Sequence, residues 1–303
     1  MLVELCPGGP RLSPVVVGVW RLHSWGWSAP QRLDWINACL DKGLSSFDHA
    51  DIYGDYAVQA LFGEALALQP GLRQRLQLVS KCGIQLVSGA RPEHRVKSYN
   101  TSAQHIRASV ERGLRELHTD WLDVLLIHRP DPLMQAQEVA RCVERLQQDG
   151  LVRHVGVSNF TPSQFELIDS ALPRGTVLCT NQIELHPLQR GPLHDGTLDQ
   201  AQRLQRRPMI WSPLAGGRLV QPGPGDDAAW RVHHVLTRLA EQWSCSPATL
   251  AYAWLLRHPS QPLPVTGTRR LDALDDALAA LNISLDSQTW AAIWQAGAGQ
   301  ELP

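Results

Sequence analysis

The chain lacks an excess of charge of either sign, and it lacks any long apolar run. Its 303 residues include 28 Lys and Arg against 29 Asp and Glu, so it has neither the basic footprint of a nucleic-acid-binding protein nor a polybasic membrane patch. No apolar stretch approaches the roughly 18 residues of a membrane span. The opening MLVELCPGGP also lacks the pattern of a signal peptide. We therefore expect a cytoplasmic protein with no nucleic-acid or membrane partner.

Metal-binding and disulfide patterns are missing as well. The chain has no CxxC pair, no HExxH motif and no Cys/His cluster at metal-ligand spacing. We expect reduced, mostly buried thiols and no metal site. The six cysteines are scattered at Cys6, Cys39, Cys82, Cys142, Cys179 and Cys245.

What the chain does contain is a regular alternation of strand-like and helix-like segments. Hydrophobic residues make up 44% of the chain, enough for a large core. Eight apolar or β-branched runs are each followed by helical sequence. These runs are residues 15–20, 45–50, 76–81, 122–128, 152–158, 177–184, 208–213 and 262–268.

This alternation predicts an α/β fold of the (β/α)₈ TIM-barrel type. Runs such as VVVGV and LDVLLI are continuously apolar, which is typical of parallel strands buried on both faces. No GxGxxG follows the first strand, which counts against a Rossmann fold. The segment MLVELCPGGPRLS predicts an N-terminal β-hairpin that caps the bottom of the barrel. No linker divides the sequence, so we expect one domain over residues 1–303.

Polar residues gather where the predicted strands end, which is where such barrels carry their active sites. Asp48 and Tyr53 follow the second strand, Lys81 ends the third and His128 the fourth. A lysine near a tyrosine favours the ionised phenol and is expected to lower its pKa. Asp48 would keep Lys81 charged. Tyr53, Lys81, Asp48 and His128 together suit proton donation to a carbonyl oxygen as hydride reaches its carbon.

The blocks DHADIYG, VSKCG, LLIHRPD, GVSNF, NQIELHP and WSPLAGG resemble the signature blocks of the aldo-keto reductases, in the order of that family. The likeness runs from about Val15 to about Trp294 and is greatest to the bacterial YdhF-like branch. It implies a catalytic tetrad of Asp48, Tyr53, Lys81 and His128, with Tyr53 as general acid. It also implies reduction of a small-molecule aldehyde or ketone by a nicotinamide nucleotide.

The resemblance further implies a set of cofactor-binding residues at the later strand ends. Ser158, Asn159 and Gln182 match the residues that hold the nicotinamide carboxamide, and Trp211 matches the aromatic that stacks on its ring. The phosphates and the adenosine end would be bound by Ser212, Leu214, Gly216, Gly267, Thr268, Arg269, Arg270 and Asp276. The family's usual contacts in the last helix are replaced by Ala273, Asp276 and Ala277. NADPH is the expected cofactor, because guanidinium groups suit phosphate, and NADH is the alternative.

Several assignments stay open at this point. Trp20, Trp25 and Trp27 either pack in the core or wall an apolar substrate pocket, and Arg129 is either a substrate anchor or an ion-pair partner. A cofactor-binding regulatory protein with vestigial catalysis is the rival function, and an isomerase on the same fold would leave the Tyr/Lys pair unused. Substrate choice is expected to lie in loops 21–29, 82–101, 186–196 and 214–227. The oligomeric state has no signal in the sequence.

Overall fold

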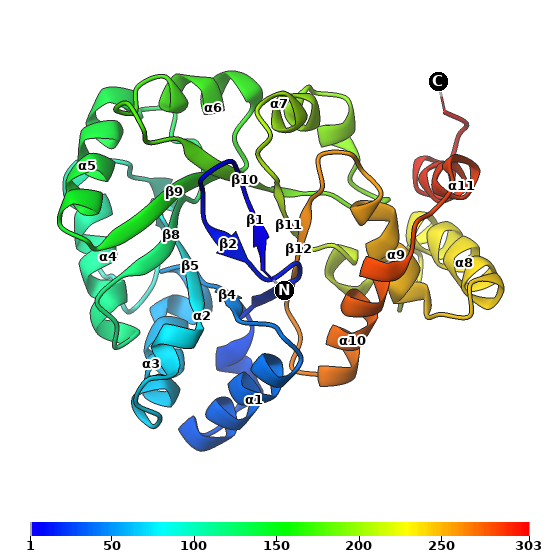
Figure 1. The fold of residues 1–303 in the computed structure, drawn as a ribbon, viewed down its shortest axis with the longest axis horizontal. Helices are drawn as coiled ribbons and strands as arrows, with labels where there is room; N and C mark the ends of the chain where they lie inside the picture. Colours follow the sequence, from blue (N-terminus) through cyan, green and yellow to red (C-terminus); the bar gives the residue numbers. More distant parts are fainter. Residues whose placement is uncertain (1, 303) are drawn as a thin grey trace. The chain divides into compact units, whose positions relative to one another are not determined.

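Eight parallel strands close into a barrel, and they follow one another around it in chain order (Figure 1). The computed structural model describes residues 2–302. The predicted (β/α)₈ barrel is therefore confirmed, and every strand lies inside its predicted run except β5, which extends one residue beyond it to Cys82. The barrel strands are β3 (Val16–Gly18), β4 (Ser46–Asp48), β5 (Gln77–Cys82), β8 (Leu122–Ile127), β9 (Val152–Ser158), β10 (Leu178–Glu184), β11 (Met209–Trp211) and β12 (Leu263–Thr266).

Helical sequence follows every strand of the barrel, as the alternation predicts. After β11 two helices occur in succession, and a last helix follows the one after β12. The helices are α1 (Ala29–Asp41), α2 (Tyr53–Tyr56), α3 (Val58–Ala67), α4 (Ala103–Glu116), α5 (Ala136–Gln148), α6 (Pro162–Asp169), α7 (Thr197–Arg203), α8 (Asp227–Gln242), α9 (Pro247–Leu256), α10 (Leu271–Ala279) and α11 (Ser287–Ala298).

The chain separates into two compact units. The first comprises residues 1–182 and 267–269, and the second comprises residues 183–266 and 270–303. In the first unit, α1 packs on α3, α3 on α4, and α4 on α5. In the second unit, α8 packs against α9 and α11. The expectation of one domain over the whole chain stays a prediction.

The predicted N-terminal hairpin is present. Strands β1 (Val3–Glu4) and β2 (Arg11–Leu12) pair antiparallel, with Val3 opposite Leu12. The segment that follows β2 is tied to the amino end of β4, because the Ser13 hydroxyl accepts hydrogen bonds from the main-chain nitrogens of Ser45 (2.8 Å) and Ser46 (3.2 Å). The hairpin thus leads to the end of β4 opposite Asp48, which is the bottom of the barrel.

Strand β8 shows why the continuous apolar runs form this sheet. All six of its residues are buried, and Leu125 pairs with Ser80 of β5 on one side and with Val155 of β9 on the other. A strand covered on both faces has no solvated side, so apolar residues occupy consecutive positions.

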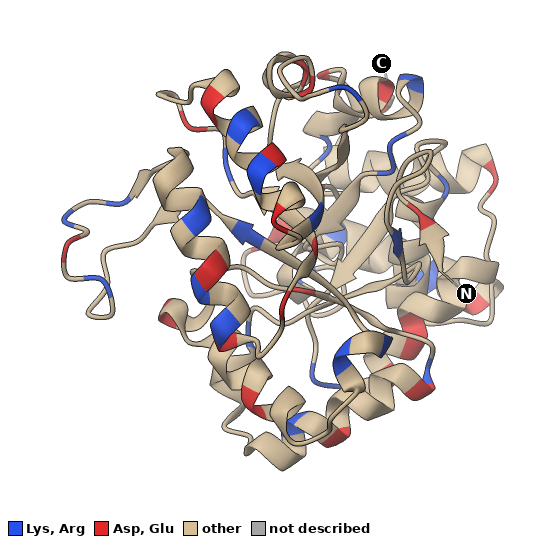
Figure 2. Cartoon of the chain, turned by 60° about the vertical axis from the view of Figure 1, so that its left-hand side comes forward, with Lys and Arg blue, Asp and Glu red and all other residues tan. Residues whose placement is uncertain are grey.

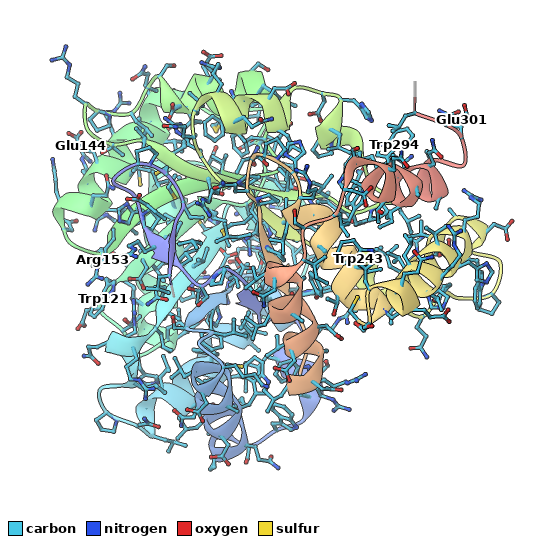
Figure 3. All side chains as sticks on the ribbon, turned by 45° about the vertical axis from the view of Figure 1, so that its right-hand side comes forward. Trp121, Glu144, Arg153, Trp243, Trp294 and Glu301 are labelled. Carbon is cyan, nitrogen blue, oxygen red and sulfur yellow. The ribbon has the colours of Figure 1, made fainter. Side chains whose placement is uncertain are left out.

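A polar cluster lies at the amino ends of β5, β8 and β9, and Figure 3 labels two of its residues, Trp121 and Arg153. The Asp123 carboxylate accepts hydrogen bonds from Arg73 Nη2 (2.8 Å) and from the main-chain nitrogen of Leu78 (2.9 Å). The guanidinium carbons of Arg73 and Arg153 lie 4.2 and 4.4 Å from the ring centroid of Trp121. This cluster stabilises the bottom of the barrel and leaves the carboxyl ends of the strands for chemistry.

Candidate active site

The Lys81 ammonium is the centre of the group that the sequence predicts to be catalytic. Lys81 lies on β5 and is 1% exposed. Its Nζ donates to Asp48 Oδ2 (2.7 Å), to the Tyr53 hydroxyl (2.8 Å) and to the main-chain oxygen of His49 (2.9 Å). An ammonium has three protons to donate, so these three acceptors fix its position completely.

The backbone around Tyr53 is held in an unusual conformation. Gly54, Asp55 and Tyr56 have φ of 57°, 56° and 68°, so three successive residues are left-handed. At Gly54 a side chain would not fit, because a Cβ atom there would lie 2.7 Å from Cγ of His23. Gly54 thus starts a strained left-handed turn directly after Tyr53. Strain of this kind is typical of functional segments.

His128 directly follows β8 and lies beside Tyr53. The two ring centroids are 6.1 Å apart, with the rings nearly perpendicular. The Nδ1 atom of His128 is buried and has no hydrogen-bond partner among the described residues. Burial, the Lys81 ammonium and two further cations hold the pKa of His128 well below its ordinary value. His128 is therefore neutral at physiological pH, so one ring nitrogen carries a proton and the other does not.

The pKa of Tyr53 shifts in the direction opposite to our expectation. Burial raises it above 10.0, and this effect outweighs the nearby ammonium of Lys81, which acts to lower it. For Lys81 itself, burial alone would lower the pKa, but Asp48 and Tyr53 together raise it above 10.5. At neutral pH the group therefore consists of a protonated tyrosine beside a charged lysine. Sequence reasoning found the pair but not the size of the desolvation effect.

Asp51 is a second buried carboxyl next to this group. It is 8% exposed, its Oδ1 has no hydrogen-bond partner among the described residues, and it faces Arg91 and Arg112. Burial raises the pKa of Asp51 from 3.8 to about 7. Its main-chain nitrogen donates to the Lys81 oxygen (3.0 Å), so Asp51 shapes the turn between Asp48 and Tyr53, as the sequence suggested.

The raised pKa of Asp51 makes stability depend on pH. The folded chain binds the proton more tightly than the unfolded chain, so the contribution of Asp51 is present below about pH 4 and is lost as the pH rises to about 7. We expect Asp51→Asn to raise the free energy of unfolding at about pH 8 by up to roughly 4 kcal/mol, and to change it little at about pH 4. Urea unfolding at both pH values measures the difference. A variant that loses equal stability at both would contradict this assignment.

Ser158, Asn159 and Gln182 form a hydrogen-bonded chain that ends on the Asp48 carboxylate. Asn159 Nδ2 donates to Ser158 Oγ (2.7 Å), and Ser158 Oγ donates to the main-chain oxygen of Gln182 (2.9 Å). Gln182 Nε2 donates to Asp48 Oδ1 (2.8 Å). The three predicted amide- and hydroxyl-bearing residues thus lie together beside Asp48. The bond from Gln182 to Asp48 has no signal in the sequence, because 134 residues separate the two.

In the second unit, the loop after β11 carries the predicted phosphate-side residues. Trp211 ends the strand, and Ser212, Ala215 and Gly216 have φ of 52°, 53° and 70°. The Ala215 nitrogen donates to the Ser212 oxygen (2.7 Å) and the Gly217 nitrogen donates to the Leu214 oxygen (2.9 Å), so these N–H groups are used within the turn. Leu214 is half-buried within the same turn. The role of this loop at a pyrophosphate stays a prediction.

The predicted cofactor-binding residues around the start of α10 are divided between the two compact units. Gly267, Thr268 and Arg269 follow β12 and belong to the first unit, where Arg269 is exposed. In the second unit, the exposed Arg270 forms an ion pair with Asp272.

Asp276, which was expected near adenine, has local partners instead. Its Oδ1 accepts hydrogen bonds from the hydroxyls of Ser246 (2.5 Å) and Thr249 (3.2 Å) at the start of α9. This contact joins two helices of the second unit. Its role at a nucleotide therefore stays a prediction.

The three tryptophans after β3 differ in packing and exposure. Trp25 and Trp27 pack against each other and against Trp35, with centroid distances of 4.8, 4.9 and 6.3 Å among the three rings. Trp20 is 57% exposed, with the Arg21 guanidinium carbon 5.4 Å from its ring centroid. Trp25 and Trp27 are thus half-buried in a tryptophan cluster, and a substrate-pocket role of the three tryptophans stays a prediction. Arg129 is half-buried next to His128.

Residues 2–302 contain neither a candidate metal site nor a candidate membrane-spanning helix. That range contains no group of three or more His, Cys, Asp or Glu side chains that could hold a metal ion. Nor does any helix in it have the length and apolar character to cross a membrane. All six cysteines are free thiols; Cys245 is half-buried and the other five are buried.

Comparisons with known proteins identify the family of the chain. The sequence model described as the Aldo/keto reductase family matches residues 14–298. The oxidoreductase YdhF of Escherichia coli is 47% identical over 302 residues, covering 99% of both chains. A 6-dehydroglucose reductase of Agrobacterium fabrum is 40% identical and covers 96% of both. The glycerol dehydrogenase structure from Gluconobacter oxydans shares the fold, with a TM-score of 0.84 at 24% identity over 99% of this chain and 95% of that one. The chain belongs to the aldo/keto reductase family of oxidoreductases.

Proposed function

We propose that this protein reduces the carbonyl group of an aldehyde or ketone to an alcohol, with NADPH as hydride donor and Tyr53 as general acid. The observation that carries the proposal is the contact of Lys81 Nζ with both Asp48 Oδ2 and the Tyr53 hydroxyl. A lysine held in this way places a fixed positive charge at a phenol. Neither an isomerase nor a purely nucleotide-binding protein requires that arrangement.

Tyr53, Lys81 and His128 each have a different role in the proposed reaction. The bound nicotinamide nucleotide supplies the hydride that reaches the carbonyl carbon. The electron pair of the C=O bond moves to the oxygen, and the Tyr53 hydroxyl gives its proton to that oxygen. Burial keeps Tyr53 protonated until this moment, and the Lys81 charge stabilises the tyrosinate that is left. The neutral imidazole of His128 can donate a hydrogen bond to the same oxygen and orient it.

The cofactor would be held by the residues that the family resemblance implies. Ser158, Asn159 and Gln182 offer amide and hydroxyl groups to the nicotinamide carboxamide, and Trp211 offers a ring to stack on it. Ser212, Leu214 and Gly216 would contact the pyrophosphate. For the 2′-phosphate that distinguishes NADPH, Arg269 is the better candidate, because Arg270 already has Asp272 as its partner.

A titration tests the cofactor assignment directly. We expect NADPH to quench the tryptophan fluorescence at lower concentration than NADH, and Arg269→Gln to weaken NADPH binding by about tenfold or more while leaving NADH binding nearly unchanged. Arg270→Gln is the matched control and should have a smaller effect. Equal affinity for both nucleotides would assign dual cofactor use. Absence of quenching by either would contradict the proposed function.

The first substrates to test are sugar-derived and simple aldehydes, since one relative is named a 6-dehydroglucose reductase. Consumption of NADPH, followed at the nicotinamide absorbance, measures turnover. Tight nucleotide binding without turnover across a broad carbonyl panel would favour a regulatory, cofactor-sensing protein instead.

A further inference from the structure

A short 3₁₀ helix, η1 (Leu22–Trp25), follows β3 and lies against the turn that begins at Tyr53. It contacts both α2 and α3. Within η1, His23 lies on Gly54, the residue directly after the tyrosine. A Cβ atom at Gly54 would lie 2.7 Å from Cγ of His23 and 2.8 Å from its Cβ and Nδ1. The imidazole therefore occupies the space that a side chain at Gly54 would need.

The helix η1 is held at both of its ends. Just before it, the main-chain nitrogen of Val19 donates a hydrogen bond to the main-chain oxygen of Asp48 (3.1 Å). At its last residue, the ring of Trp25 packs against the ring of Trp35 in α1, with 4.9 Å between the centroids. His23 therefore projects from a segment that is tied to β4 on one side and to α1 on the other.

The turn after Tyr53 needs support from other segments of the chain. Gly54, Asp55 and Tyr56 have φ of 57°, 56° and 68°. Residues with side chains rarely adopt this left-handed conformation, and such strain persists only where surrounding contacts hold it. The hydroxyl of Tyr53 accepts a hydrogen bond from Lys81 Nζ at 2.8 Å. A relaxed turn would therefore move the Tyr53 ring relative to the lysine.

Contacts with other segments hold this turn at its two ends. At the far end, the main-chain nitrogen of Leu86 donates to the Tyr56 hydroxyl (2.9 Å), and the Arg91 guanidinium carbon lies 4.5 Å from the Tyr56 ring centroid. These two contacts come from the segment between β6 (Ile84–Gln85) and β7 (Ser98–Tyr99). Figure 2 shows its loop extending away from the helices, with blue segments on both sides of one red segment. At the near end, the supporting contact is that of the η1 imidazole on the glycine.

We propose that His23 is a positioning residue for Tyr53: its imidazole packs on Gly54 and holds the turn that presents the Tyr53 hydroxyl to Lys81 and to the carbonyl oxygen. The role rests on the proposed function, because it acts through the proton donor. Two of the atoms nearest to Gly54 are Cβ and Cγ, the base of the side chain, so the ring cannot swing clear unless η1 moves. Packing is the property that this role requires, so another flat ring should serve as well.

Substitutions of His23 test whether the ring positions the proton donor. His23→Ala should lower kcat for an aldehyde by about tenfold or more, because a small displacement of a reacting group is costly in rate, while the Kd for NADPH changes less than about twofold. His23→Phe should restore most of the lost kcat. His118→Asn is the matched control, since it removes an exposed imidazole beyond α4, where φ is 49° and asparagine is tolerated. It should leave kcat unchanged.

A double variant tests the contact itself. Gly54→Ala places a methyl group against the ring of His23 and should lower kcat by about a hundredfold. Adding His23→Ala makes room for that methyl group, so in this background it should raise kcat, whereas in the wild type it lowers kcat. If Gly54→Ala does not fold, the expected result is that the double variant regains folding. Gly150→Ala controls for strain alone, because φ is 73° there and a Cβ would meet nothing within 4 Å.

The outcomes distinguish the positioning role from the function beneath it. If His23→Ala reduced an aldehyde at the wild-type kcat, the positioning role would be overturned and the reductase would stand. His23→Phe as slow as His23→Ala would also overturn it, because the imidazole chemistry and not its packing would then be required. A double variant no better than Gly54→Ala would do the same. A wild type that reduces no aldehyde would overturn the proposed function, and the positioning role with it.

Discussion

Replacing Tyr53 by phenylalanine is expected to lower kcat by about a thousandfold or more while the affinity for NADPH changes less than about threefold. The substitution removes one oxygen, which accepts a hydrogen bond from Lys81 Nζ and which, in the proposed function, donates the proton. The interaction exists only as the carbonyl oxygen gains charge, so its loss appears in kcat. Steady-state kinetics and a fluorescence titration of the same preparation measure the two quantities.

A second tyrosine serves as the control for this substitution. The Tyr252 hydroxyl accepts a hydrogen bond from the Thr266 hydroxyl (3.0 Å). Tyr252→Phe therefore loses a buried hydrogen bond, with a cost in stability of about 1 kcal/mol, and should keep most of its activity. If Tyr53→Phe retained a large fraction of wild-type kcat, another group would have to be the proton donor.

Lys81→Met is expected to abolish activity and to lower the free energy of unfolding by about 3–5 kcal/mol, because Asp48 becomes an unpaired buried carboxylate. Asp48 is 2% exposed and would keep only its bond from Gln182. Urea unfolding of the variant and the wild type measures the loss. Since the pKa of folded Lys81 lies above 10.5, the stability contributed by its charge is fully present below about pH 10.5. It is lost only as the pH rises through the folded value.

The double variant Asp48→Asn/Lys81→Met separates the cost of an unpaired Asp48 charge from the cost of losing the packing of the lysine side chain. Its asparagine is neutral and still accepts from Gln182, so most of the stability should return while activity stays absent. A double variant as unstable as Lys81→Met would show that packing around the lysine stem, and not the stranded charge, dominates the cost.

The sequence predicted that Asp48, Lys81 and His128 lie together, because a parallel barrel brings strand ends together. Asp48, Lys81 and His128 lie at or directly after the ends of β4, β5 and β8, so counting strands was enough to place them on one edge. Ser28 likewise marks the start of α1, where its nitrogen donates to Gln31 Oε1 (2.9 Å) as the capping box predicts.

Other features of the site depend on tertiary contacts that a sequence pattern does not reveal. The third acceptor of Lys81 is the main-chain oxygen of His49. Every residue has such an oxygen, so the residue type at position 49 does not predict this contact. The direction of the Tyr53 pKa shift depends on how far the phenol is desolvated, which only coordinates give. The Ser246 hydroxyl, 30 residues away in the sequence, donates a hydrogen bond to Asp276. This tertiary contact competes with the predicted role of Asp276 at adenine.

The central claim is that hydride and proton reach one carbonyl with Tyr53 as the acid. The most direct measurement uses NADPH carrying deuterium at both C4 positions, an aldehyde substrate, and mass analysis of the alcohol formed by the wild type and by Tyr53→Phe. The account predicts an alcohol with a single deuterium on its carbinol carbon from the wild type and almost none from the variant. An unlabelled alcohol, or equal labelled product from both proteins, would contradict it.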